Sequence, residues 1–173
     1  ENDVNGGSIR VFISHKERKI KESKNLKSLF KAEAEMGLKN KATYINFYNK
    51  ILNIKSKVRR AIFDELKNGL VFGLGASTKG NMLLQTFELG KDIIPFISER
   101  NSNKVGLKTL GTDIELISEI SARNKNPKMM LVLPWYFKDE IIKRERSYLL
   151  NGGKLLIPMP YPHIVNINGE IKL

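Results

Sequence analysis

The stretch LVFGLGASTKGNMLLQTFELG, residues 70–90, decides the fold class. Its first six residues, LVFGLG, are a short and nearly continuous apolar run of the kind found in strands buried on both faces. Residues 81–90 then place apolar side chains at helical spacing and end at Gly90, as an amphipathic helix does. A buried strand that leads directly into a helix indicates a βαβ unit and therefore a parallel sheet.

The same alternation continues toward the C-terminus. Apolar runs predict strands at 92–98, 128–134 and 154–160, a helix at 136–153, and either a short strand or the approach to a helix at 113–117. We therefore predict the α/β class, with a Rossmann-like three-layer domain and a parallel sheet over residues 70–173, preceded by two helices.

The N-terminal part has a different rhythm. Residues 6–14 alternate as a strand does, a lysine-rich connector follows, and helical patterns cover 26–38 and 42–69, so residues 15–69 are interpreted as a linker and two helices. One apolar stripe runs along the second helix, and such a stripe is more often core or a partner-helix contact than a base-stacking surface. Its members are Tyr44, Phe47, Tyr48, Ile51, Ile54, Val58, Ile62 and Leu66.

Composition excludes several classes of function. The 173 residues include no cysteine and only two histidines, which excludes disulfides, thiolate metal sites and a cysteine nucleophile and disfavours a histidine metal site. No apolar run reaches the roughly 20 residues of a membrane span, and the N-terminus lacks the features of a signal peptide. The first residue is not methionine, so we expect the chain to begin inside a longer, cytoplasmic protein.

The net charge of +12 is concentrated near the N-terminus, where residues 1–60 carry 15 Lys and Arg against 6 Asp and Glu. A basic face could meet RNA, DNA, a membrane or an acidic partner, or its lysines could simply be solvated. Nucleic acid is not the partner we expect, because the first 60 residues contain no RNP motif, zinc finger or arginine-rich recognition segment.

Ligands of open parallel sheets lie at the carboxyl ends of the strands. Three predicted loop segments converge there, namely residues 73–81, 99–112 and 133–137. The first of them has a glycine spacing that suggests a Walker A loop, but Asn81-Met82 stands where Lys-Ser is required, and a G-x-G-x-x-G match fails at Thr78. ATP hydrolysis and a standard dinucleotide fingerprint are therefore both disfavoured.

Two interpretations of the GASTKGN loop remain open. A glycine turn at a helix start, with Ser77, Thr78 and Lys79, could hold an anion such as a phosphate. The same residues could equally form a strand-to-helix turn in which Ser77 or Thr78 caps the helix.

The other two segments carry further candidates. Glu99 ends the second strand, where a Rossmann fold places the acid for a ribose hydroxyl, and it could alternatively be a capped strand end. Trp135 could form the wall of a ligand pocket or pack on the sheet edge. No base–nucleophile pair and no carboxylate pair is recognisable, so we predict no self-contained active site and no catalytic residue in this chain.

Taken in order, four segments resemble a known family. They are VFGLGASTKGNMLLQ, SERNSNKVGLKTLGTDIEL, LVLPWYFKDEII and NGGKLLIPMP. Over residues 5–160 they are similar to the C-terminal domain of S-adenosylmethionine-dependent C-methyltransferases, the family that includes sugar C-methyltransferases of deoxysugar biosynthesis. The family pattern is GASAKGN, then DRNPxKQGxxxPGTxIPI, then LLPWNxxxEI, then GGKFIVPxP.

The resemblance implies a domain that lies downstream of the chemistry. Residues 1–14 resemble the last strand of the preceding methyltransferase domain, so the zinc-binding module, the donor-binding domain and the catalytic Tyr/Glu/His segment of the family would all lie upstream. S-adenosylmethionine would then be bound mainly upstream, with no cofactor certain in this chain. The domain would close over its neighbour and help to hold a nucleotide-sugar or other phosphorylated acceptor.

The resemblance also marks residues for acceptor binding. Together with Thr78 and Glu99 from the loops above, they are Gly75, Ser77, Lys79, Gly80, Asn81, Arg100, Asn101, Lys104, Pro134 and Trp135, with no metal ligand among them. Four positions depart from the pattern, namely Asn5 for histidine, Glu99 for aspartate, Leu110 for proline and Tyr136 for asparagine. The departures at Leu110 and Tyr136 lie on the acceptor side and leave the acceptor's identity open.

The leading hypothesis is therefore an acceptor-binding, closing domain of a methyltransferase. A stand-alone nucleotide-binding Rossmann-like domain and a basic protein- or nucleic-acid-interaction module are the alternatives. The upstream methyltransferase domain is the expected protein partner, homo-oligomerisation is left open, and no membrane contact is expected.

Overall fold

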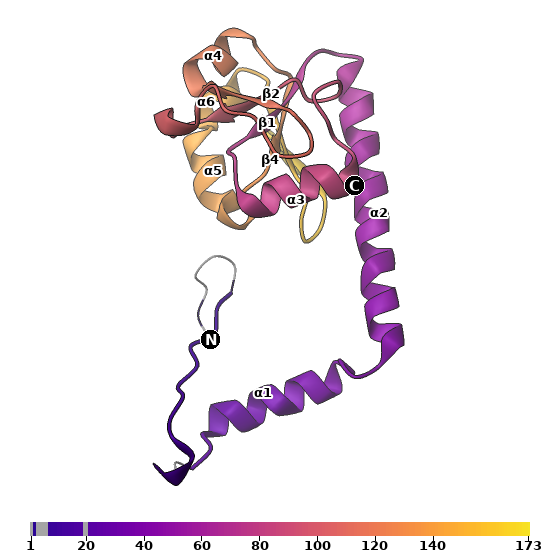
Figure 1. The fold of residues 1–173 in the computed structure, drawn as a ribbon. Helices are drawn as coiled ribbons and strands as arrows, with labels where there is room; N and C mark the ends of the chain where they lie inside the picture. The colour runs from indigo at the N-terminus through magenta and orange to yellow at the C-terminus, as the bar shows by residue number, and fades with distance from the viewer. Residues whose placement is uncertain (1, 3–6, 19–20) are drawn as a thin grey trace. The chain divides into compact units, whose positions relative to one another are not determined.

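The computed structural model describes residues 2, 7–18 and 21–173 (Figure 1). The chain divides into two compact units, Glu1–Ile51 and Leu52–Leu173. The first contains the 3₁₀ helix η2 (Lys16–Arg18), the helix α1 (Lys24–Glu35) and the beginning of α2 (Lys41–Leu66). Both α-helices start at a polar side chain that caps a backbone N–H group, Ser23 for Leu26 at 3.1 Å and Asn40 for Ala42 at 2.9 Å.

The strand expected at 6–14 is not found in the described residues of that stretch, 7–14, where Ser8 forms an isolated bridge with Asn2. Residue 6 lies outside the described residues. A strand needs a neighbouring strand to satisfy its backbone N–H and C=O groups, and the prediction assigned this one to the sheet of an upstream domain. That assignment stays a prediction.

The second unit is built on one seven-stranded sheet with the order β3-β2-β1-β4-β5-β6-β7. Strands β3 to β5 are mutually parallel, whereas β6 and β7 join antiparallel at one side. The strands are β1 (Val71–Leu74), β2 (Phe96–Glu99), β3 (Glu115–Ser118), β4 (Met129–Val132), β5 (Lys154–Ile157), β6 (His163–Asn166) and β7 (Gly169–Lys172).

Helices cover both faces of this sheet and make three layers (Figure 1). The helices α4 (Glu119–Asn124), α5 (Lys138–Arg144) and α6 (Arg146–Leu150) lie on one face, whereas α3 (Thr78–Phe87) and the part of α2 from Leu52 onward lie on the other. Two short 3₁₀ helices, η3 (Ser102–Lys104) and η4 (Trp135–Phe137), follow β2 and β4.

The core explains why the strands are continuously apolar. All four residues of β1 are buried, and Phe72 and Leu74 point toward a cluster that includes Ile141 of α5. On the opposite face Gly73 faces Ile97, and Val58 and Ile62 of α2 are fully buried. Both faces of the central strands are therefore removed from water, which is the arrangement that parallel sheets require.

The α/β class and the Rossmann-like parallel sheet are thus confirmed. Two details differ from the prediction. The helix expected at 136–153 is divided into η4, α5 and α6, and the buried Glu145 lies at the boundary between α5 and α6. The β6–β7 hairpin was not predicted; its two-residue turn is Ile167-Asn168, between the paired residues Asn166 and Gly169.

Candidate acceptor-binding cleft

The strand order fixes where a ligand can bind. The chain leaves β1 toward β2 and β3 on one side and returns to β4 on the other, so the connections after β1 and β4 diverge at the carboxyl ends of these strands. Such a switch point leaves a crevice outside the strand ends. The first and third predicted loop segments begin here, and the second begins next to them, after β2.

The turn after β1 is held by packing as well as by capping. Gly75 has a φ of +75°, and a Cβ there would lie 3.0 Å from Pro134 Cγ. The Ser77 hydroxyl accepts the Gly80 N–H at 3.0 Å, which makes Ser77 the N-cap of α3. A Cβ on Gly80 would lie 2.5 Å from Leu133 Cβ, so glycine lets α3 approach the β4 loop closely.

Glu99 ties this turn to the loop after β2. Its side chain is buried, with Oε2 accepting the Ala76 N–H and Oε1 accepting the Asn101 N–H, both at 2.8 Å. Lys104 donates from Nζ to the Ala76 carbonyl at 3.1 Å. Both charged side chains therefore fix the loops, and Glu99 retains lone pairs for a ligand hydroxyl because each carboxylate oxygen accepts more than one hydrogen bond.

Two cations lie near the turn. The Lys79 ammonium sits 4.6 Å from the centre of the Tyr136 ring, at cation–π distance. Arg100 is exposed, and its side chain makes no ion pair or hydrogen bond with the residues that the structure describes. Asn101 is occupied locally, because its Oδ1 accepts the Asn103 N–H at 3.0 Å and caps η3.

A cleft of about 430 Å³ opens at the switch point, within the roughly 300–1,000 Å³ that ligand pockets occupy. Of the predicted site residues, it is lined by Gly75, Ser77, Glu99, Arg100 and Pro134. The remaining predicted residues lie outside its lining, namely Thr78, Lys79, Gly80, Asn81, Asn101, Lys104 and Trp135. Trp135 packs against the core cluster, and Tyr136 lines the cleft.

No sequence pattern pointed to the other polar residues of the lining. Ser98 comes from β2, Glu119 from α4, and Glu140 and Arg144 from α5. Ser98 stands directly before Glu99 at the end of a predicted strand, which is the only signal that could have pointed to it. The helical residues reach the cleft through tertiary packing, which no local pattern records.

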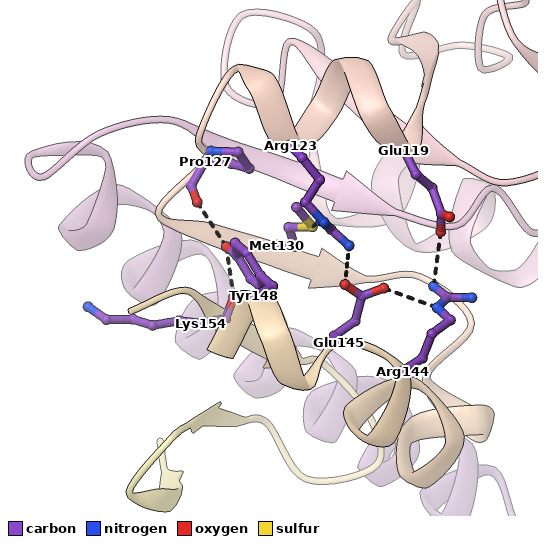
Figure 2. Close-up of polar contacts among 8 residues, drawn as sticks. All are labelled: Glu119, Arg123, Pro127, Met130, Arg144, Glu145, Tyr148 and Lys154. Carbon is purple, nitrogen blue, oxygen red and sulfur yellow. Dashed lines mark hydrogen bonds and ion pairs between the residues drawn. The ribbon is translucent and has the colours of Figure 1, made fainter. Parts of the chain in front are cut away.

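Arg144 lines this cleft, and Figure 2 shows its ion pairs. Its Nε lies 3.0 Å from Glu145 Oε1, and its Nη2 lies 3.5 Å from Glu119 Oε1. Glu145 is 3% exposed and also pairs with Arg123. Two arginines compensate this buried carboxylate, and the network links α4 to the junction between α5 and α6.

The same region contains a buried phenol. Tyr148 donates its hydroxyl to the Pro127 carbonyl at 2.9 Å, and burial raises the pKa of Tyr148 above its ordinary value of 10.0 (Figure 2). Above pH 10 the folded protein therefore keeps a proton that the unfolded chain loses, and the free energy of unfolding falls as pH rises.

This predicts an alkaline loss of stability that depends on Tyr148. Between pH 10 and 11 its contribution should approach about 1.4 kcal/mol per pH unit. Urea unfolding followed by the fluorescence of the single tryptophan should show a shallower alkaline decline for Tyr148→Phe than for the unchanged chain. Tyr161→Phe, at a 79% exposed position, should follow the unchanged chain. Equal slopes in all three proteins would contradict the prediction.

Among the described residues, no group of three acidic or histidine side chains is placed to hold a metal ion. Within the same residues, no helix is long and apolar enough to cross a membrane.

The strand order and the cleft at its switch point define a Rossmann-like α/β domain. The model of a family described as the C-methyltransferase C-terminal domain matches residues 3–160, and the chain belongs to that family. It is also similar to the C-methyltransferase NovU of Streptomyces niveus, with 30% identity over 170 residues that cover 98% of this chain and 40% of the relative. The chain thus spans less than half the length of that relative.

Proposed function

We propose that this chain is the acceptor-binding and closing domain of a C-methyltransferase that uses S-adenosylmethionine, and that the acceptor is a nucleotide-sugar or a similar phosphorylated molecule. The relative is named a C-methyltransferase, and most of its length has no counterpart in this chain. The donor-binding and catalytic residues are accordingly assigned to an upstream part. The observation that carries the proposal is the cleft at the switch point, with Arg100 in its lining.

The surroundings of the turn suit a phosphorylated ligand. The first N–H groups of a helix lack partners within the helix and carry partial positive charge, and α3 begins at Thr78, directly beside the cleft-lining Ser77. Lys79 and Arg100 would add full positive charges to this end. Lys104 supports the turn through Ala76 and would contribute mainly by keeping the loop in place.

The proposed chemistry explains why a separate closing domain is useful. C-methylation beside a carbonyl removes a proton from the acceptor carbon, and the resulting enolate attacks the methyl group of the sulfonium, which leaves as the thioether. A closing domain excludes water and fixes the distance between the two reactants. The residues of this chain would bind and orient the acceptor, and none of them would transfer the proton.

Isothermal titration calorimetry of the 173-residue chain tests the proposal. We expect heat with nucleoside diphosphates and nucleotide-sugars, and no tight binding of NAD or S-adenosylmethionine. Tight binding of NAD would favour a stand-alone dinucleotide domain. Salt-dependent binding of RNA or DNA would favour a basic interaction module. Either result in the absence of nucleotide-sugar binding would overturn the proposal.

Lys79→Ala should weaken the binding of a nucleoside diphosphate by about tenfold, because a charge-assisted contact with phosphate contributes about 1.5 kcal/mol. The measurement is the dissociation constant from the same calorimetry. Lys125→Ala is a matched control, because the Lys125 ammonium also lies over an aromatic ring, 4.7 Å from the centre of Phe96, and Phe96 begins β2 at the opposite end of that strand from Glu99 and the cleft. Equal affinities for the two variants would assign Lys79 a structural role only.

A further inference from the structure

One polar group in the cleft is buried without a partner. Ser98 is 1% exposed, and its hydroxyl oxygen finds no hydrogen-bond partner among the residues that the structure describes. Side chains alternate along a strand, and Ser98 is in register with Leu74, so both point to the face that α4 and α5 cover. Both residues line the cleft. A buried hydroxyl without a partner is costly, and a ligand hydroxyl would satisfy it.

The lining of the cleft does not suit a diphosphate. Its charged side chains are three carboxylates, Glu99, Glu119 and Glu140, against the two guanidinium groups of Arg100 and Arg144. Arg144 is already engaged by Glu119 and Glu145. A dianion placed among these groups would face more negative than positive charge. The phosphates are therefore better placed at the edge of the cleft, near Arg100 and the start of α3.

The remaining groups suit a nucleoside. Glu140 is exposed at the start of α5, and its side chain makes no ion pair or hydrogen bond with the described residues. Carboxylates accept hydrogen bonds from hydroxyl groups. Phe137 is 45% exposed beside it and offers an apolar ring to a planar base. Such aromatic stacking does not depend on the identity of the base.

We propose that the cleft binds the nucleoside half of the acceptor, with the base on Phe137 and the ribose hydroxyls on Glu140 and Ser98. This inference rests on the proposed function. There the proton transfer and the methyl donor belong to an upstream part, so the reacting glycosyl group must extend out of this cleft. The nucleoside is the end of the acceptor that a non-catalytic domain can hold, and the diphosphate spans the distance between them.

Calorimetry of the 173-residue chain with four probes tests this: uridine diphosphate, adenosine diphosphate, inorganic pyrophosphate and a hexose 1-phosphate. The better of the two nucleotides should bind at least about tenfold more tightly than pyrophosphate or the hexose phosphate, in line with one or two added hydrogen bonds and base stacking. Glu140→Gln should weaken nucleotide binding by about tenfold and change pyrophosphate binding by less than about twofold.

Asp139→Asn is the matched control, because Asp139 is the neighbouring carboxylate in the first turn of α5 and does not line the cleft. It should leave both affinities unchanged. A hexose phosphate that binds more tightly than either nucleotide would overturn this inference and leave the proposed function standing. An equal effect of Glu140→Gln on nucleotide and pyrophosphate would also overturn it. No binding of any probe or nucleotide-sugar would instead overturn the proposed function.

Discussion

We expect Glu145→Ala to lower the free energy of unfolding of the second unit by about 3 kcal/mol, the low end of what breaking a buried ion pair costs. The carboxylate is 3% exposed and is shared by Arg123 and Arg144. Removing it leaves two arginines without their buried partner. Each of them keeps about a third of its side chain exposed, so water can partly solvate the freed charges and limit the loss.

Urea unfolding followed by tryptophan fluorescence measures this loss, because Trp135 is the single tryptophan and packs against the core cluster of the second unit. Glu119→Ala is the control, since it removes a 31% exposed partner that lies 3.5 Å from Arg144. Exposed pairs of this kind contribute about 0–1 kcal/mol. A similarly small loss for Glu145→Ala would mean that the network does not hold α4, α5 and α6 together.

Glu145 also shows why the sequence predicted the fold better than its details. The central strands are continuous apolar runs, so their position and parallel pairing follow from hydrophobicity and from the helices between them. The boundary between α5 and α6 lies at Glu145, whose buried carboxylate pairs with Arg123 from another part of the chain. Helical periodicity contains no information about such a partner, and the prediction therefore continued one helix through Glu145.

The same limit applies to the candidate cleft. The sequence predicted that the loops containing Gly75, Glu99 and Pro134 meet, because the carboxyl ends of parallel strands lie at one edge. It could not choose between Trp135 and the adjacent Tyr136, since the 3₁₀ turn decides which ring packs inward. Residues such as Glu140 reach the cleft only through the packing of a helix on the sheet. The helical pattern places Glu140 on the polar side of its helix, where it looks like any solvated carboxylate.

Gly80→Ala should lower the free energy of unfolding by about 2 kcal/mol, even though alanine is the better helix former by about 1 kcal/mol. The new Cβ would lie 2.5 Å from Leu133 Cβ, 3.3 Å from Leu133 Cα and 2.9 Å from the Ser77 hydroxyl. Backbone atoms cannot rotate away, so α3 must move outward from the β4 loop. The shift would also disturb the hydrogen bond by which Ser77 caps the helix, worth about 1 kcal/mol.

Comparison with Met82→Ala tests whether Gly80 is required for the packing of α3 on Leu133. Met82 lies on the same helix, two residues further along, and is 66% exposed, so its loss should change stability by no more than about 0.5 kcal/mol. The measurement is urea unfolding followed by tryptophan fluorescence. If Gly80→Ala and Met82→Ala have the same free energy of unfolding, the contact with Leu133 relaxes without cost, and glycine is needed there for another reason, such as the approach of a ligand. A larger loss of stability in Gly80→Ala would show that Gly80 serves the close packing on Leu133 that positions Ser77 and the turn beside the cleft.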